Sequence, residues 1–508
     1  MSRVIGAALC GVEGVPVEVE VRLSSQLPRV DIVGLPEAAV RESVARVRAA
    51  IVSAGRVFPD RRVTVNLAPA SMRKSGAGLD LPIAIAILAA ASDLPAERLD
   101  GFGFAGELAL DGRLRPVPGL LALALGIRDG GCRTVVVPAS GAAEAALAPG
   151  LEILAAASLG EVLSHLDGSA LLPAVAPPLL PSFAADPTLD LADVRGQERA
   201  RRALEVAAAG GHALLLCGPP GSGKTMLARR LPGLLPPLCF EEALEATRVH
   251  GAAGRLDARS PIVTERPLRA PHHSASLAGL LGGGSPPRPG EVSLAHRGVL
   301  FLDELPEFER RVLEALRQVL EDKRVTVARA RGTCAFPADF QLVAAANPCP
   351  CGWRLSQQRD CRCDEGAIAR YAARLSGPLL DRIDLHVSVP GVSWADLDRP
   401  SAGPDSREVR NRVVAARTRQ AERLLGTGVL TNAALPDSHL DTLVDATPEA
   451  RALLGRAVDR LKMSARAARR VLRVARTVAD LAGDERVGPP ALAEALGYRE
   501  NATGTCGI

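Results

Sequence analysis

The sequence contains few aromatic residues and little net charge. Phe, Trp and Tyr make up 3% of its 508 residues, which argues against a platform on which nucleic-acid bases stack. The net charge of +4 is too small to indicate a nucleic-acid partner by itself. With 47% hydrophobic and 23% charged residues, the composition is typical of a soluble globular protein of several domains.

The sequence also shows no pattern typical of an export signal or of a membrane-spanning segment. No N-terminal stretch combines a basic region with a long apolar core, so we expect no export signal. The longest apolar run, LPIAIAILAAA at 81–91, is too short to span a bilayer. The ten cysteines are therefore expected to be reduced thiols or metal ligands rather than disulfides. These features predict a cytoplasmic protein without a membrane partner.

Shifts in composition divide the chain into domains. Strand-like and helix-like runs alternate over residues 1–170, which predicts an α/β domain. Residues 171–190 are rich in Pro and Ala without helical periodicity, as expected of a linker. We expect a nucleotide-binding domain at 191–400, and a 3.6-residue apolar period predicts a helical domain at 401–508.

The most informative motif is LLLCGPPGSGKT, residues 214–225. An apolar strand, a Gly-rich loop and a helical pattern follow one another, which fits a phosphate-binding loop. Backbone N–H groups and the helix N-terminus would hold phosphate, Lys224 would reach the β- and γ-phosphates of ATP, and the Thr225 hydroxyl would bind Mg²⁺. The expected nucleotide-binding residues are Gly218, Pro219, Pro220, Gly221, Ser222, Gly223, Lys224, Thr225 and Asp303.

Two further apolar strands end in polar residues suited to hydrolysis. The stretch GVLFLDEL (298–305) ends in Asp303, which would act through Mg²⁺, and Glu304, which would orient or deprotonate the attacking water. The stretch QLVAAANP ends at Asn347, whose amide is a candidate for holding the same water. The sequence therefore predicts an ATP hydrolase with Glu304 and Asn347 in its catalytic site.

Two arginines are candidates for contacts with phosphate from outside the loop. Arg382 follows a short apolar helix and would reach a neighbouring subunit's γ-phosphate as an arginine finger. The alternative for Arg382 is a surface salt bridge with Asp381 or Asp384. Arg466, within KMSARAARR, would contact phosphate from the helical domain, and its alternative is a basic residue on a basic helix face.

Together these residues resemble AAA+ ATPases, and more narrowly the magnesium-chelatase-like family of ComM and YifB. The specific marks extend over the chain: VRGQERARRALEVAAAGGH (194–212), LRAPHHSAS (268–276), RPGEVSLAHRGVLFLDELPEF (288–308), FQLVAAANPCPCG (340–352) and SGPLLDRIDLH (376–386). The resemblance implies an α/β AAA+ P-loop core with a helical lid of the magnesium-chelatase C-terminal type, with Asn347 as sensor 1 and Arg466 as sensor 2. It also implies a homohexamer that moves along DNA and promotes branch migration in recombination and natural transformation. Single-stranded and branched DNA and recombination proteins are the implied partners.

Residues 1–170 are similar to the S5-like proteolytic domain of Lon. The stretches MRKSGAGLDLPIAIAILAA (72–90) and GELALDGRLRPVPGLLALALGIRDGGCRTVVVPA (106–139) resemble the regions that carry Lon's nucleophile and its catalytic lysine. On that pattern the serine position falls on Gly76, one residue after Ser75, and the lysine position falls on Leu121. A Ser–Lys dyad needs a hydroxyl and an amine within hydrogen-bond reach, so we expect no proteolysis.

Two segments of the ATPase domain bear on its partner. The Gly- and Pro-rich stretch 266–291 contains His272 and His273, and the resemblance places such an insertion toward the hexamer pore. We expect these histidines to serve in a pore loop or a subunit contact rather than to bind metal. The stretch 323–345 predicts two strands joined by a turn, with Arg329 and Arg331 near the tip as candidate contacts to DNA phosphates. The alternative is a hairpin that only packs against a neighbouring subunit.

Four cysteines lie within CPCGWRLSQQRDCRC, at Cys349, Cys351, Cys361 and Cys363. Two Cys-x-Cys pairs can present four thiolates tetrahedrally, as zinc prefers, and a closed site of this kind is structural rather than catalytic. The spacing differs from the commoner Cys-x-x-Cys, and the alternative is four free thiols. We expect structural Zn²⁺ that braces the segment leading to Arg382.

Two other functions share parts of this pattern. A metal-insertion motor of the magnesium chelatase type has the same ATPase motifs, but it lacks the Lon-like domain and the cysteine quartet. No D-x-S-x-S metal-dependent adhesion motif is present in this sequence either. A non-proteolytic AAA+ remodelling protein is the second alternative, and stimulation of ATP hydrolysis by DNA would separate both from a translocase.

Overall fold

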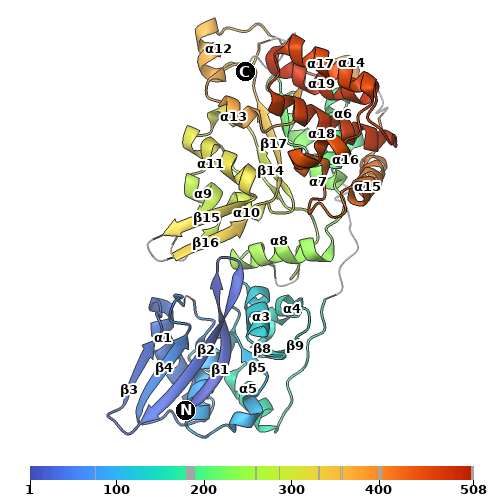
Figure 1. The fold of residues 1–508 in the computed structure, drawn as a ribbon. Helices are drawn as coiled ribbons and strands as arrows, with labels where there is room; N and C mark the ends of the chain where they lie inside the picture. The colour runs from blue at the N-terminus through green and yellow to red at the C-terminus, as the bar shows by residue number, and fades with distance from the viewer. Residues whose placement is uncertain are drawn as a thin grey trace.

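The chain folds into an N-terminal α/β domain, an ATPase core and a helical lid (Figure 1). The computed structural model describes residues 1–74, 76–178, 189–257, 260–284, 287–329, 332–354, 356, 359–398 and 403–504. Both sheets of the α/β parts contain parallel strands, and the mixed α/β fold class expected from the sequence is confirmed.

The N-terminal domain is built on a seven-stranded mixed sheet of order β3-β4-β2-β1-β5-β8-β9. Its strands are β1 (Ser2–Cys10), β2 (Glu13–Ser24), β3 (Arg29–Val33), β4 (Arg62–Ala68), β5 (Phe102–Phe104), β8 (Thr134–Pro138) and β9 (Glu152–Ala156). The strands β1, β2 and β4 pair antiparallel, whereas β5, β8 and β9 pair parallel. The sequence RVTVNLA of β4 alternates buried and partly buried residues, which is the pattern of a strand with one face on the core.

Helices complete the core of this domain. They are α1 (Ala38–Ser53), α2 (Asp80–Ala90), α3 (Leu120–Asp129), α4 (Ala142–Ala145) and α5 (Leu159–Asp167), with a small ribbon of β6 (Glu107–Leu108) and β7 (Leu114–Arg115). The apolar run that is too short for a membrane forms α2, and its residues 80–88 are all buried. Asp80 begins this helix and forms a bidentate ion pair with Arg46 of α1, which offsets the cost of burying its carboxylate.

The ATPase core is a parallel five-stranded sheet of order β11-β14-β17-β10-β18. Its strands are β10 (Leu214–Cys217), β11 (Leu268–Arg269), β14 (Val299–Leu302), β17 (Gln341–Ala346) and β18 (Leu385–Ser388). Every residue of β10, β14 and β17 is buried, as expected for continuous apolar strands covered on both faces. β10 lies between β17 and β18, so the phosphate loop that follows β10 leaves the sheet between these two strands.

Helices and two hairpins surround this sheet. The helices are α6 (Glu198–Gly210), α7 (Lys224–Leu234), α8 (Phe240–Ala252), α9 (Leu277–Leu281), α10 (Glu291–Leu294), α11 (Arg310–Asp322), α12 (Glu365–Ala372) and α13 (Gly377–Leu380). The hairpins are β12 (Gly282–Gly283) with β13 (Arg288–Pro289), and β15 (Arg324–Arg329) with β16 (Gly332–Pro337). We call the segment 270–289, which contains α9, β12 and β13, the insert.

The lid consists of helices that follow the core. They are α14 (Trp394–Asp398), α15 (Ser406–Arg423), α16 (Leu440–Leu443), α17 (Pro448–Leu461), α18 (Ala465–Ala482) and α19 (Pro489–Gly504). The side chains of Asp405, Thr447 and Ser464 accept backbone N–H groups at the starts of α15, α17 and α18, which stabilises each helix start. The lid packs against α6 and the central strands in one continuous apolar core.

The N-terminal domain contacts the ATPase core through α8 and the β15–β16 hairpin (Figure 1). Val12, in the turn between β1 and β2, is buried in the same cluster as Phe336 of β16. Ala243 of α8 is likewise buried in the cluster formed by α3. At both contacts, apolar side chains of the two domains are buried in shared clusters.

The stretch expected as a linker does not begin as one. Ala174 bridges Leu154 of β9, and the backbone N–H of Val175 donates to Ile153 O at 2.8 Å. This short pairing at the edge of the sheet gives hydrogen-bond partners to backbone groups of residues 174 and 175, which the composition of the segment does not predict. Among the described residues, no helix is both long and apolar enough to cross a membrane.

Candidate active site

The phosphate loop joins β10 to α7 at the carboxyl edge of the parallel sheet. Gly221 and Gly223 have φ of +74° and +89°, a left-handed conformation that glycine adopts without strain. Gly218 has no room for a side chain, because a Cβ there would lie 2.0 Å from Val389 O. These positions therefore require glycine for conformational or steric reasons, and the loop leads into the N-terminus of α7.

Lys224 folds into this loop. Its Nζ donates to Gly218 O at 2.7 Å, to Pro219 O at 2.9 Å and to Asn347 Oδ1 at 3.1 Å. Burial lowers the pKa of Lys224, while the nearby Asp303 carboxylate opposes that shift. The structure therefore brings the phosphate-loop lysine and the sensor candidate Asn347 into direct contact.

Asp303 and Thr225 meet where Mg²⁺ is expected. The Thr225 hydroxyl donates to Asp303 Oδ2 at 2.8 Å, and the other carboxylate oxygen accepts the N–H of Glu304 at 3.0 Å. Mg²⁺ prefers hard oxygen ligands of this kind, so the two side chains fit the ion. Thr225 lies in the first turn of α7 and Asp303 directly follows β14, so both stand at the same edge of the sheet.

Glu304 lies beside these residues in an unusual backbone conformation. Its φ of 52° and ψ of 48° place a non-glycine residue in the left-handed region, which costs about 1–3 kcal/mol and is common at functional sites. Its side chain is 49% exposed, and one carboxylate oxygen lies 3.2 Å from Nδ1 of His273. The sequence did not indicate this partner, since the two residues are separated by α9, both strands of the insert and β14.

Arg382 is held by contacts within this chain. Its guanidinium contacts the carboxylate of Glu321, at the end of α11, and donates to Pro378 O at 2.6 Å. The side chain is 6% exposed. The sequence suggested Asp381 or Asp384 as the partner of Arg382. Among the described residues the ion pair of Arg382 is instead with Glu321, which α11 brings close to it.

The segment after Arg382 is fastened to the lid. Arg470 of α18 donates to Arg382 O at 3.1 Å and to Asp384 Oδ1 at 2.5 Å, and His212 Nδ1 lies 3.0 Å from Asp384 Oδ2. Burial alone would raise the pKa of Asp384, but His212 and Arg470 hold that pKa well below its usual range. Arg466 is exposed in the first turn of α18, four residues before Arg470. Residues four apart share a helix face, so Arg466 lies on the side of the lid that approaches Arg382.

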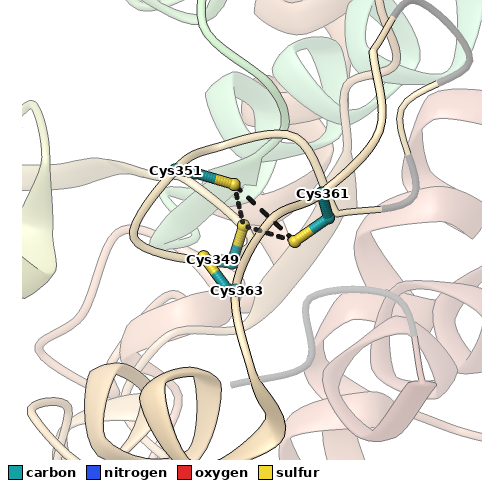
Figure 2. Close-up of side chains that lie close together, drawn as sticks. All are labelled: Cys349, Cys351, Cys361 and Cys363. Carbon is teal, nitrogen blue, oxygen red and sulfur yellow. Dashed lines mark hydrogen bonds between the residues drawn. The ribbon is translucent and has the colours of Figure 1, made fainter.

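The four cysteines converge in one cluster between β17 and α12 (Figure 2). Their sulfur atoms all lie within 4.8 Å of one another, with Cys349 buried and the other three partly exposed. Although partial burial opposes the shift, the backbone N–H groups of Trp353 and Arg362 lower the pKa of Cys351 to about 6. Four convergent thiols with amide groups directed at one of them form a donor set suited to a tetrahedral soft-metal site.

The cysteine loop also touches the phosphate loop. Gly352 has a φ of +81°, and a Cβ built there would lie 2.6 Å from Cδ of Pro220. Asn347, which contacts Lys224, immediately precedes the segment that begins the cluster. The cluster is thus placed to hold the side of the phosphate loop at Pro220 in position. It is also placed to hold the segment that leads to Arg382.

The hairpin expected as a DNA contact forms as a two-stranded ribbon. Arg329 is the last residue of β15 and pairs with Gly332 of β16. Val325 and Val327 are buried, whereas Arg324 and Thr326 are exposed, so one face packs on the core and the other faces out. Arg331 lies outside the described residues, as does the side chain of Arg329.

The N-terminal domain has no Ser–Lys dyad at the positions expected from Lon. Gly76 has a φ of +83° in an open loop, and Leu121 is fully buried in α3. Lys74, which the sequence pattern did not single out, is buried, and its Nζ donates to the carbonyl oxygens of Gly34, Pro69 and Met72. Ser75 lies outside the described residues. Among those described, no hydroxyl is recorded as a partner of the Lys74 amine.

Comparisons with known proteins give the same family along most of the chain. Residues 190–397 match the family "Magnesium chelatase, subunit ChlI", residues 19–141 match "Subunit ChlI of Mg-chelatase" and residues 403–499 match "Magnesium chelatase, subunit ChlI C-terminal". The chain is 44% identical over 503 residues to the competence protein ComM of Haemophilus influenzae, covering 98% of this chain and 97% of ComM. It is 44% identical over 501 residues to the uncharacterised protein YifB of Escherichia coli, with 98% and 97% covered.

Two further relatives extend this picture. An uncharacterised protein of Mycobacterium tuberculosis is 45% identical over 503 residues, covering 98% of this chain and 99% of the relative. Lon protease 2 of Bacillus subtilis is 31% identical over 187 residues, which is 31% of this chain and 32% of that protease. The expected likeness to Lon is thus present over part of the chain.

Proposed function

This chain belongs to the ComM and YifB family of magnesium-chelatase-like AAA+ ATPases, and from that membership we propose that it is a hexameric motor that moves along DNA and promotes branch migration during recombination. The name of its relative ComM connects that protein with competence. We extend this connection to the present chain as a role in natural transformation, in the cytoplasm and with recombination proteins as partners.

The observation that carries the proposal is the grouping of Lys224, Thr225, Asp303, Glu304 and Asn347 at one edge of the sheet. Lys224 would exchange its carbonyl partners for the β- and γ-phosphate oxygens of ATP. Mg²⁺ bound by Thr225 and Asp303 would neutralise charge on those phosphates. Glu304, beside Asp303 and partly exposed, would orient the attacking water, and Asn347 would hold it from the adjacent strand.

A ring would complete this site from a neighbouring subunit. Arg470, one helical turn after Arg466 in α18, donates to the backbone oxygen of Arg382, so the start of α18 lies near Arg382. We propose that both act on the nucleotide of the adjacent subunit, as finger and sensor 2. Arg382 would have to leave Glu321 to do so, and its attraction to a γ-phosphate is the force that would draw it out.

We further propose that the cysteine cluster holds a structural zinc ion. Four convergent sulfurs support this assignment, since four thiolates are the tetrahedral donor set of structural zinc sites. The resident ion would close the loop that contacts Pro220, and it would leave no coordination position open for chemistry.

DNA would be contacted by the β15–β16 hairpin and the insert. We propose Arg329 and Arg331 as the phosphate contacts, with little dependence on base sequence because the chain has few aromatics for stacking. The family names include magnesium chelatase throughout, so they do not by themselves separate a DNA motor from a metal-insertion motor. Stimulation of ATP hydrolysis by DNA would distinguish the DNA motor from the metal-insertion motor.

The test measures ATP hydrolysis without DNA and with single-stranded, duplex and four-way-junction DNA. We expect stimulation by DNA, and we expect binding to weaken steeply with salt because counterions are released. Replacing Arg329 and Arg331 together with Ala should reduce the salt slope by about one unit per lost phosphate contact and remove the stimulation. Arg113 and Arg115, two exposed arginines at the same spacing in the N-terminal domain, supply the matched Ala control. Negligible, salt-insensitive DNA binding by the parental protein would overturn the translocase in favour of a chelatase-type motor.

A further inference from the structure

The turn that joins β1 to β2 packs the N-terminal domain against the β15–β16 hairpin of the ATPase core (Figure 1). Gly11, in this turn, lies so close to the hairpin that an added Cβ would be 2.9 Å from Ala335 O and 3.6 Å from Cβ of Cys334. In the same turn, Val12 O accepts a hydrogen bond from Nε of Arg248 in α8 at 3.4 Å. The turn is therefore held by both α8 and β16, and its residues meet those of the hairpin in a defined arrangement.

A pair of thiols lies at this contact, one from each domain. Cys10 is the last residue of β1, and Cys334 lies in β16 opposite Val327 of β15. Their sulfur atoms are 3.9 Å apart, although the two residues are 324 positions apart in the chain. A disulfide bond is about 2.0 Å long, so the sulfurs have to approach by about 2 Å more, and rotations about χ1 of two short side chains can supply that movement. The pair is separate from the cysteine quartet, whose four sulfurs form their own cluster.

Small oxidants can reach this pair of thiols. Cys10 and Cys334 are both partly exposed, and both line a cavity of about 820 Å³ between the N-terminal domain, the insert and the hairpin. Burial, and after it the charge of Cys334, raises the pKa of Cys10 to about 11. Cys10 therefore keeps its proton at neutral pH, which leaves Cys334 as the first nucleophile and Cys10 as the thiol that reacts second.

We propose that Cys10 and Cys334 are a redox site, at which hydrogen peroxide converts the two thiols into a reversible disulfide that fastens the hairpin to the N-terminal domain. The Cys334 thiolate attacks one peroxide oxygen, the O–O bond breaks, and the leaving hydroxide takes up a proton to become water, so that Cys334 becomes a sulfenic acid. The sulfur of Cys10 then attacks the sulfenic sulfur and loses its proton. The S–S bond forms, the S–O bond breaks and a second water leaves. In total two thiols are oxidised and one peroxide is reduced to two waters.

The disulfide would act on the hairpin close to its tip. Gly332, the first residue of β16, pairs with Arg329, and Cys334 follows two residues later. Arg329 and Arg331 are the proposed DNA contacts, so the effect of the disulfide on DNA rests on the proposed function. A hairpin that pulls DNA has to shift against the rest of its subunit, and a covalent bond to the end of β1 would prevent that shift. Neither cysteine belongs to the phosphate loop or to the strand ends beside it, so ATP hydrolysis without DNA should continue.

Peptide mapping tests the disulfide itself. The parental protein is treated with hydrogen peroxide, its remaining thiols are blocked with N-ethylmaleimide, and it is digested without reduction for mass spectrometry. Trypsin and chymotrypsin are used together, because cleavage after Phe340 separates Cys334 from the quartet. We expect the Cys10 peptide joined to the Cys334 peptide, and separation of the two by dithiothreitol. Cys239→Ser, at an exposed cysteine of the ATPase core, is the control and should form the same link. Absence of the linked peptide from peroxide-treated parental protein would overturn the proposal.

ATP hydrolysis with and without single-stranded DNA tests the restraint on the hairpin. Peroxide should lower the DNA-stimulated rate of the parental protein at least in proportion to the fraction of chains that carry the disulfide, and dithiothreitol should restore that rate. Cys10→Ser keeps the quartet, so damage there would affect it equally, yet its stimulated rate should withstand peroxide. An equal loss in Cys10→Ser, or an unchanged rate in the cross-linked parent, would overturn the restraint. If DNA does not stimulate the reduced parental protein, the translocase proposal fails, while the linked peptide still decides the redox site.

Discussion

Gly352 connects the cysteine cluster to the phosphate loop, and Gly352→Ala tests whether that contact supports the proposed binding of ATP. Gly352 has a φ of +81°, and an added Cβ would lie 2.6 Å from Cδ and 2.8 Å from Cγ of Pro220 in the phosphate loop. The nearer contact is about 0.8 Å short of the 3.4 Å at which ordinary van der Waals contact begins. Both atoms belong to a proline ring, which cannot rotate away as the end of a flexible side chain would.

Two effects should add in this variant. The left-handed backbone costs an alanine about 1–2 kcal/mol relative to glycine, which lowers the free energy of unfolding. The steric contact should displace Pro220 and with it the backbone N–H groups that are proposed to hold phosphate. We expect ATP to bind about tenfold more weakly, equivalent to about 1.4 kcal/mol.

A fluorescent ATP analogue titrated into the protein measures the affinity, and thermal denaturation measures the backbone strain. Gly426→Ala is the matched control, because Gly426 has a φ of +84° with nothing within 4 Å of an added Cβ. Both variants should lose similar stability from strain, but only Gly352→Ala should lose affinity. Equal ATP affinity in the two variants would refute the idea that the cysteine loop supports the phosphate loop.

Three further predictions concern metal, subunit contact and pH. The purified protein should carry about one zinc per chain by elemental analysis, and Cys361→Ser should lower zinc content and melting temperature together; a metal-free protein that is folded and active would refute the site. Mixed rings of Arg382→Ala and Lys224→Ala chains should recover part of the ATPase activity that each homogeneous ring lacks, because one interface then regains both groups. Burial raises the pKa of Glu144 in the folded protein to about 7. Protonation of this carboxyl group therefore adds to the free energy of unfolding in full below the unfolded pKa near 4.5, and the contribution is lost as pH rises through 7. Glu144→Gln should therefore match the parent near pH 4.5 and be more stable near pH 8, by at most about 3 kcal/mol, in thermal melts across that range.

The phosphate loop and the ends of its strands were predictable because their signals are local. LLLCGPPGSGKT contains its strand, its turn glycines and its helix start in one contiguous stretch, and each follows from the chemistry of the residues themselves. The cysteine cluster was predictable for the same reason, since its four members lie close enough in sequence for a short loop to bring them together. The pairing at the start of the predicted linker could not be predicted, because Ala174 bridges Leu154 through backbone groups, which every residue has.

By itself the sequence indicated which residues are suited to chemistry, and it placed them at the ends of particular strands. The tertiary structure decided which of them meet: Lys224 with Asn347, Arg382 with Glu321, and His273 with Glu304. Each of these pairs joins elements far apart in the chain, and contact depends on the sheet order β11-β14-β17-β10-β18 and on helix packing around it. Hydrophobic periodicity specifies that a strand is buried, but many strand orders bury the same residues equally well. Only the packed fold selects the order that brings these side chains together.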